Sequence, residues 1–135
     1  MTHVEKALEL HANGYNCAQA VLCAFEDKLD LPKEVLYKLS EGFGLGMGNM
    51  QGTCGAISGA IMAIGFIESN GNTAFEGPKS KALTYARTRK ILEGFKNERG
   101  TVRCLDLKTK DGPSFTPCRE CVALASRLLE EELEK

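Results

Sequence analysis

The sequence predicts an all-α fold, a compact bundle of about five to six helices that forms a single helical domain with a cysteine cluster over residues 1–135. Three observations predict it. Apolar residues recur at the three-to-four spacing of a helix face, no segment alternates apolar and polar residues as a half-buried strand does, and Gly, Pro and capping residues punctuate the chain at helix-length intervals. With 135 residues, 43% of them apolar, the chain can remove roughly two-thirds of its unfolded surface from water without disulfide staples.

The first two helices are predicted from their apolar faces and their ends. Over residues 2–12, apolar positions fall at i, i+3, i+4 and i+7, and Gly14 follows as a stop. His11 lies at the edge of this face and is assigned no role. Asn16 is a favourable N-cap for a second helix that begins at Cys17 and closes around Asp30, before Leu31-Pro32.

Pro32 begins a third short helix over residues 33–41, and a Gly-rich segment follows it. Glycines at every second position from Gly42 to Gly48 argue against a stable helix and predict a turn-rich loop that closely approaches another group. The segment lacks the Lys and Ser/Thr of a P-loop and the strand of a dinucleotide fingerprint, which argues against a nucleotide site.

The central helix is predicted from Cys54 to about Glu68, with Thr53 as its cap. Gly55, Gly59 and Ala63 recur every four residues on one face, and small residues in this pattern let two helix backbones pack closely. The same small-residue helix and the Gly-rich loop could serve a homodimer.

A long basic helix is predicted next, from Pro78 to about Arg99, after a polar loop. Its expected buried side comprises Ala82, Tyr85, Ala86, Ile91, Leu92 and Phe95. Residues 79–110 carry a net charge of +7, which is typical of a solvated face and could also hold thiolates or an anionic partner.

The last predicted helix starts at Thr116-Pro117, after a long loop over residues 100–116 that contains Cys104. A loop of this length in a small domain tends to be functional or mobile. Residues 130–134 place acidic side chains at the negative end of the helix dipole, so we expect this end to fray.

Charge and hydropathy exclude several classes of partner. Seventeen Lys and Arg against 18 Asp and Glu give a net charge of −1, which provides no global field for nucleic acid. The longest apolar run, residues 54–67, is too short for a membrane span. The first ten residues lack the pattern of a secretory signal, so we expect a cytoplasmic location.

Six cysteines in a cytoplasmic chain point to metal binding or redox chemistry rather than to a disulfide framework. Cys17, Cys54 and Cys118 fall at predicted helix starts, where unpaired amides and the helix dipole stabilise a thiolate. Cys118 and Cys121 form a CxxC whose two thiols share one helix face, so a disulfide or shared metal ligation is sterically allowed. Cys23 lies on another face of its helix and is left out of the site.

These motifs also resemble a known family. The segments from Asn16 to Val21, Gly42 to Gly48 and Cys54 to Ala60, followed by Cys104 and the Cys118/Cys121 pair, are similar to the C_GCAxxG_C_C family of putative redox-active proteins. This chain reads Cys-Gly-Ala-x-x-Gly where the family name spells Gly-Cys-Ala-x-x-Gly. The resemblance implies a small helical protein whose cysteines act together in redox chemistry. Carried over by position, it favours the set Cys17, Cys54, Cys104, Cys118 and Cys121.

Three hypotheses for the function remain open at this point. In the first, a thiol-dependent oxidoreductase, Cys118 attacks, Cys121 or Cys54 resolves, no cofactor is required, and the redox partner is another protein or a small thiol. In the second, a metal-binding module, Cys118 and Cys121 with two of Cys17, Cys54 and Cys104 hold Zn²⁺ or an iron–sulfur cluster. In the third, the protein is a helical scaffold with inert buried thiols.

Overall fold

The computed structural model describes residues 1–135 and confirms the all-α prediction. Two single turns, α4 (Gly44–Met47) and α7 (Cys104–Lys108), and two 3-10 turns, η1 (Glu26–Lys28) and η2 (Glu41–Phe43), connect the longer helices. The only β-type pairing is an isolated bridge between Thr53 and Arg103. The six helices of eight or more residues are α1 (His3–Ala12), α2 (Cys17–Ala24), α3 (Lys33–Ser40), α5 (Gly55–Glu68), α6 (Lys81–Arg99) and α8 (Cys118–Leu133).

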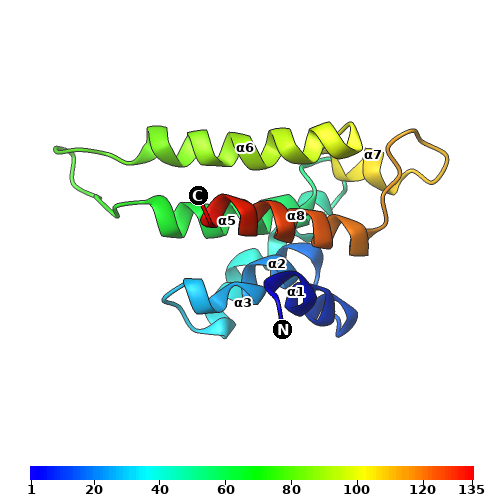
Figure 1. Ribbon diagram of the computed structural model, residues 1–135, viewed down its shortest axis with the longest axis horizontal. Coiled ribbons are helices and arrows are strands. Elements are labelled where there is room, and N and C mark those ends of the chain that lie inside the picture. The colour runs from blue at the N-terminus through cyan, green and yellow to red at the C-terminus, as the bar shows by residue number, and fades with distance from the viewer.

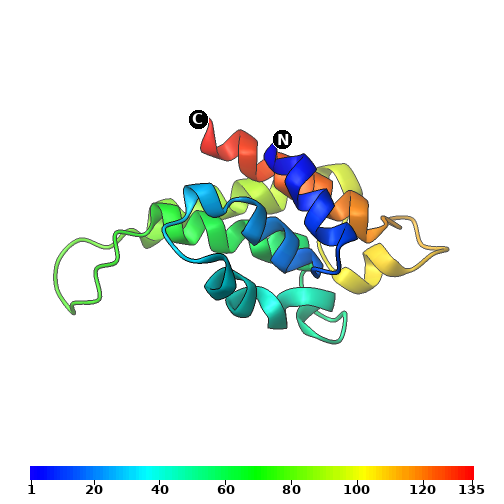
Figure 2. The ribbon, with the colours of Figure 1, turned by 90° about the horizontal axis from the view of Figure 1, so that it is seen from below.

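The helices stack in layers around α5. Helix α6 forms one outer layer, α5 and α8 lie beneath it, and α1, α2 and α3 cover the opposite side (Figure 1). Seen at right angles, α1 runs beside α8, so the two ends of the chain lie on the same side of the molecule (Figure 2). Helix α5 contacts α2, α6 and α8 and is therefore the central helix, as predicted.

The small-residue face of α5 packs against α2 of the same chain. A Cβ at Gly59 would lie 2.5 Å from the carbonyl oxygen of Ala18, and a Cβ at Gly55 would lie 2.8 Å from that of Phe43. The predicted close approach of two backbones is thus made within the chain. Because this face is covered, it offers no surface to a second copy, and a homodimer stays a prediction.

Helix α2 ends earlier than predicted, at Ala24 rather than near Asp30. Phe25 is fully buried, and its ring stacks on His3 with the ring centroids 4.2 Å apart. The charged residues that follow have no apolar stripe to continue the helix, so they form the 3-10 turn η1.

Helix α6 begins at Lys81 after Ser80, three residues later than the predicted start at Pro78. Ile91 and Phe95 are buried as predicted, but Ala82 and Tyr85 are exposed. The first turns of α6 extend past the C-terminal end of α8 (Figure 1), so α8 does not cover Ala82 and Tyr85, and Tyr85 is 55% exposed.

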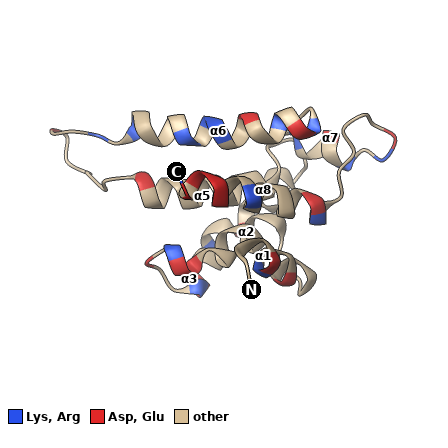
Figure 3. Cartoon of the chain, in the orientation of Figure 1, with Lys and Arg blue, Asp and Glu red and all other residues tan.

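The acidic end of α8 does not fray, which corrects the prediction from its charge. The helix continues to Leu133, and Glu132 is only 4% exposed. Arg87 of α6 explains this, because its guanidinium donates to the Glu132 carboxylate (3.2 Å), to the Glu132 carbonyl oxygen and to Glu68. The basic helix α6 therefore faces the acidic end of α8 and compensates its charge (Figure 3).

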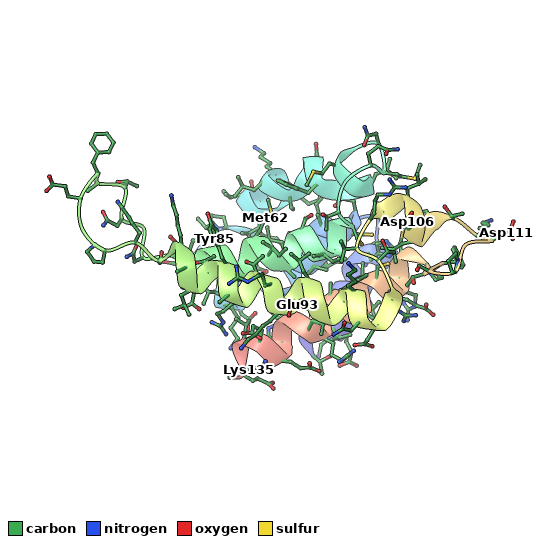
Figure 4. All side chains as sticks on the ribbon, turned by 90° about the horizontal axis from the view of Figure 1, so that it is seen from above. Met62, Tyr85, Glu93, Asp106, Asp111 and Lys135 are labelled. Carbon is green, nitrogen blue, oxygen red and sulfur yellow. The ribbon has the colours of Figure 1, made fainter.

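Two loops extend from opposite ends of the helical body (Figure 1). One comprises residues 69–80 and carries a fully exposed Phe75. The other comprises residues 109–117 and has Asp111 near its tip (Figure 4). No helix has the length and apolar character that crossing a membrane requires.

Candidate functional site

Five of the six cysteines gather around one cavity, and all six are reduced. The cavity has a volume of about 220 Å³, and its wall includes Cys17, Cys54, Cys104 and Cys118. Cys121 is fully buried behind it next to Cys54, and its thiol donates to the carbonyl oxygen of Thr116 (3.8 Å). The structure thus brings together the five thiols that the sequence selected.

Cys23, which the sequence left out, lies elsewhere. It is fully buried in α2, with its sulfur 4.0 Å from the carbonyl oxygen of Lys33. Burial raises the pKa of this thiol to about 11, with smaller opposing effects of nearby charges. Its surroundings are those of an inert core residue.

Four of the clustered thiols sit at helix starts. Cys17 and Cys118 are the first residues of α2 and α8, as predicted. Cys104, expected in a loop, is the first residue of the single turn α7. Cys54 is the N-cap of α5 in place of the predicted Thr53. The Cys54 amide donates to the carbonyl oxygen of Val102 (2.8 Å). Because the backbone of Cys54 is extended, the helix begins one residue later than predicted, at Gly55.

A capping box fixes the start of α2. The Asn16 side chain accepts a hydrogen bond from the Gln19 amide (2.9 Å), and the Gln19 side chain accepts one from the Asn16 amide (3.0 Å). The side-chain amide of Asn16 (Nδ2) also donates to the carbonyl oxygen of Glu41 (3.0 Å). The residue before Cys17 therefore joins the start of α2 to the turn η2.

The Gly-rich segment closely approaches this chain's own Cys104. The Cys104 amide donates to the carbonyl oxygen of Gly52 (3.0 Å), and the Gly52 amide donates to that of Gly46 (3.0 Å). Gly46 has a left-handed backbone (φ 56°), and a Cβ there would lie 2.3 Å from the Cβ of Cys104. The loop that sequence reasoning expected to approach something closely therefore supports a thiol.

The same segment holds Leu45, Met47 and Met50 in left-handed backbone conformations, which are unfavourable for residues with a Cβ. Leu45 lies at the cavity wall and is 54% exposed. Strained positions of this kind persist where surrounding contacts hold them, and they gather at functional sites.

The first thiol pair joins Cys17 to Cys118. Their sulfur atoms lie within 4.8 Å of each other. The hydrogen bond from the Cys17 thiol lowers the pKa of Cys118 to about 5, burial acts against this, and the ammonium group of Lys108 adds to the lowering. The pKa of Cys17 is raised by the same hydrogen bond and by burial. Cys118 is thus the thiolate of the pair and Cys17 the proton-bearing thiol.

The second pair joins Cys54 to Cys121. A hydrogen bond from Cys121 lowers the pKa of Cys54 to about 7 against the effect of burial, helped by the amides of Ala56 and Ile57 at the start of α5. The pKa of Cys121 is raised by this hydrogen bond and by burial. Cys118 and Cys121 of the CxxC motif are therefore each paired with a thiol from another element, Cys17 and Cys54 respectively.

Lys108 is a site residue that sequence reasoning did not select. It lines the cavity beside Cys118. Burial lowers the pKa of Lys108, but the neighbouring thiols raise it more, so it stays charged. The signal available in the sequence was the basic run of residues 79–110, to which Lys108 belongs.

His11 is the second residue that was missed. Its Nε2 lies 3.9 Å from the sulfur of Cys17, and the ligand atoms of His11, Cys17 and Cys118 all lie within 4.8 Å of one another. In the sequence, its only signal was a place at the edge of an apolar helix face. These three side chains could hold a metal ion.

Comparison with known proteins gives one match. The model of a family described as "Putative redox-active protein (C_GCAxxG_C_C)" matches residues 15–132. The matched range contains all five clustered cysteines and Lys108, whereas His11 precedes it. No curated protein and no solved structure matches the chain.

Proposed function

The chain belongs to the C_GCAxxG_C_C family of putative redox-active proteins, and from this membership we propose that its clustered cysteines carry out thiol–disulfide exchange, with Cys118 as the attacking thiolate. The observation that carries the proposal is the meeting of Cys118 with the protonated thiol of Cys17 and the ammonium group of Lys108 at one cavity. A nucleophilic thiolate beside a cation, with a second thiol in reach, is what dithiol chemistry requires.

The exchange proceeds in two displacements. The Cys118 thiolate attacks one sulfur of a disulfide substrate, forms a mixed disulfide and releases one substrate thiolate. The Cys17 thiol then loses its proton and attacks the Cys118 sulfur, which closes the Cys17–Cys118 disulfide and releases the second thiolate. The protein loses two electrons and the substrate gains two. One product thiol takes the proton of Cys17 and the other takes a proton from water.

Cys54 and Cys121 form a second pair in which one pKa is lowered and the other raised, like the first. Two dithiol pairs hold up to four electrons in one site. We assign Cys104 to the same wall as a supporting thiol, since burial raises its pKa and it has no thiol hydrogen bond of its own. This arrangement uses Cys17 as the resolving thiol in place of Cys121 or Cys54.

Disulfide mapping tests the proposal. Reduced, chelator-treated protein is oxidised with a low-molecular-weight disulfide, free thiols are alkylated, and the linked peptides are identified by mass spectrometry. We expect the Cys17–Cys118 disulfide to form first. Cys118→Ser should prevent it and Cys23→Ala should not. A chain that keeps six free thiols, or that first links Cys118 to Cys121, would contradict the assignment.

A further inference from the structure

We propose that the reduced site binds one Zn²⁺ through His11 Nε2, Cys17 Sγ and Cys118 Sγ, and that oxidation of the Cys17–Cys118 pair releases the ion. The first half stands on the geometry of these three side chains. The second half rests on the proposed function.

The spacing of the three ligand atoms fits one tetrahedral ion. Zn–S bonds of about 2.3 Å and Zn–N bonds of about 2.0 Å place two sulfurs about 3.8 Å apart and a sulfur and a nitrogen about 3.5 Å apart. The observed Nε2–Sγ distance between His11 and Cys17 is 3.9 Å, and all three atoms lie within 4.8 Å. Small side-chain rotations therefore bring the set to the required geometry.

Ligand chemistry and position agree with this geometry. One imidazole and two thiolates form a common zinc ligand set, and three protein ligands leave the fourth position to water. The site lies at the wall of the cavity, so an ion has a path to it. His11 in the last turn of α1, Cys17 at the start of α2 and Cys118 at the start of α8 come from three elements that pack on one another, which preorganises the set.

Disulfide formation and zinc binding exclude each other, because both use the same two sulfurs. When a low-molecular-weight disulfide oxidises the pair, the two thiolates lose two electrons and form the S–S bond. The small disulfide gains these electrons, its S–S bond breaks, and the two thiolates released take protons from water. His11 alone cannot retain the ion, so Zn²⁺ leaves to solvent. Conversely, bound zinc slows the oxidation of both thiols without preventing it.

Cobalt titration tests the ligand set. Reduced, metal-free protein is titrated anaerobically with Co²⁺. We expect one ion per chain, with tetrahedral visible bands and a sulfur-to-cobalt charge-transfer band that Zn²⁺ abolishes by displacement. Cys17→Ser and Cys118→Ser should each remove about half of the charge-transfer intensity and weaken binding more than about tenfold. His11→Ala should weaken binding similarly but keep the charge-transfer band.

The same cobalt titration provides the control and shows which results would contradict the site. Cys23→Ala, outside the cavity, should leave the titration unchanged. Absence of the bands in the parent protein, full charge-transfer intensity in Cys17→Ser or Cys118→Ser, or parent-like affinity in any of the three variants would overturn the site. Circular dichroism checks the folding of each variant, and His11→Ala, at a half-buried position, keeps the test decisive if a cysteine variant does not fold.

A second measurement separates this inference from the proposed function. Zinc-loaded protein is treated with the small disulfide, and released zinc is followed with a chromogenic chelator. We expect one Zn²⁺ per Cys17–Cys118 disulfide. If the protein fails to bind Zn²⁺ or Co²⁺ in the titration but still forms the Cys17–Cys118 disulfide, the zinc site is wrong and the dithiol function stands. If zinc binds to the three residues but no disulfide forms even without metal, the dithiol function and the release step are wrong and the site stands.

Discussion

Cys118 owes its proposed role to neighbours that are far away in the sequence. Its position at a helix start could be predicted from Thr116-Pro117, and the structure confirms it. The two groups that lower its pKa most, the Cys17 thiol and the Lys108 ammonium, come from other elements. No local pattern encodes such a contact, which is why Lys108 and His11 were missed while the cysteines were found.

Replacing Lys108 should shift the titration of Cys118. Lys108→Met removes a cation that stabilises the thiolate, so we expect the midpoint of the pH–rate profile for alkylation of Cys118 to rise from near pH 5 by about one unit or more. Below the new midpoint the variant should react more slowly than the parent protein. The measurement is the iodoacetamide reaction rate against pH, with a chelator present and Cys118 identified by mass spectrometry.

Lys110→Met is the matched control, because Lys110 is an exposed lysine two residues away. It should leave the midpoint where it is. An equal shift in both variants would show that general charge, not the contact with Cys118, sets the pKa.

Helix ends and glycines determine how the thiols are placed. The glycine spacing predicted that the loop approaches something closely, but the identity of the partner depends on α7, which sequence reasoning did not find within the expected loop of residues 100–116. A five-residue turn has too few residues for a periodic signal. The extent of α2 was also missed, since the burial of Phe25 against His3 is a tertiary effect.

Gly46→Ala should destabilise the loop that packs against Cys104. The new Cβ would meet the Cβ of Cys104 at 2.3 Å in a left-handed backbone, so we expect a loss of about 3 kcal/mol in the free energy of unfolding, from the clash and the conformational strain together. Gly48→Ala has the same kind of backbone (φ 88°) but no atom within 4 Å, and should lose only about 1 kcal/mol. Urea unfolding measures both; equal losses would rule out the clash.

Two glycines of α5 should respond in opposite directions. Gly59→Ala places a Cβ 2.5 Å from the Ala18 carbonyl oxygen and should cost about 2 kcal/mol by forcing α2 and α5 apart. Gly65→Ala meets no atom within 4 Å and should stabilise the helix by about 1 kcal/mol through its higher helix propensity. Thermal unfolding of the two variants beside the parent protein checks the pair. Destabilisation by both would contradict the packing described for α5.

The layered bundle is held at its ends by charged contacts that join distant helices. Arg87 links α6 to the end of α8, and His3 of α1 contacts both Asp27 (2.8 Å) and Glu130 of α8 (2.9 Å). The all-α class and the order of the long helices could be predicted from periodicity, because each helix carries its own apolar stripe. The docked acidic end of α8 could not, since its compensation by Arg87 requires knowledge of which helices are neighbours.

The contacts of His3 should make stability depend on pH. Burial lowers the pKa of His3, but its hydrogen bonds to Glu130 and Asp27 raise it more, so the folded value lies above the ordinary 6.5. A group whose pKa is higher in the folded than in the unfolded state stabilises the fold at pH values below its unfolded pKa. This stabilisation is lost as the pH rises through its folded pKa. We expect His3→Gln to cost about 1 kcal/mol at acidic pH and much less in alkaline solution.

Urea unfolding of both proteins at about pH 5.5 and about pH 9 measures this difference. Comparing the variant with the parent at each pH cancels the titration of the cysteines, which the two share. A cost that is the same at both pH values would show that His3 acts through its stacking on Phe25 alone.

Because the activated thiol needs partners from the beginning and the end of the chain, the order of synthesis matters. While a ribosome is still translating the middle of this protein, Cys17 has emerged without the helix that begins at Cys118. A nascent chain therefore carries unpaired thiols, and the reactive centre comes into being only when the last helix docks.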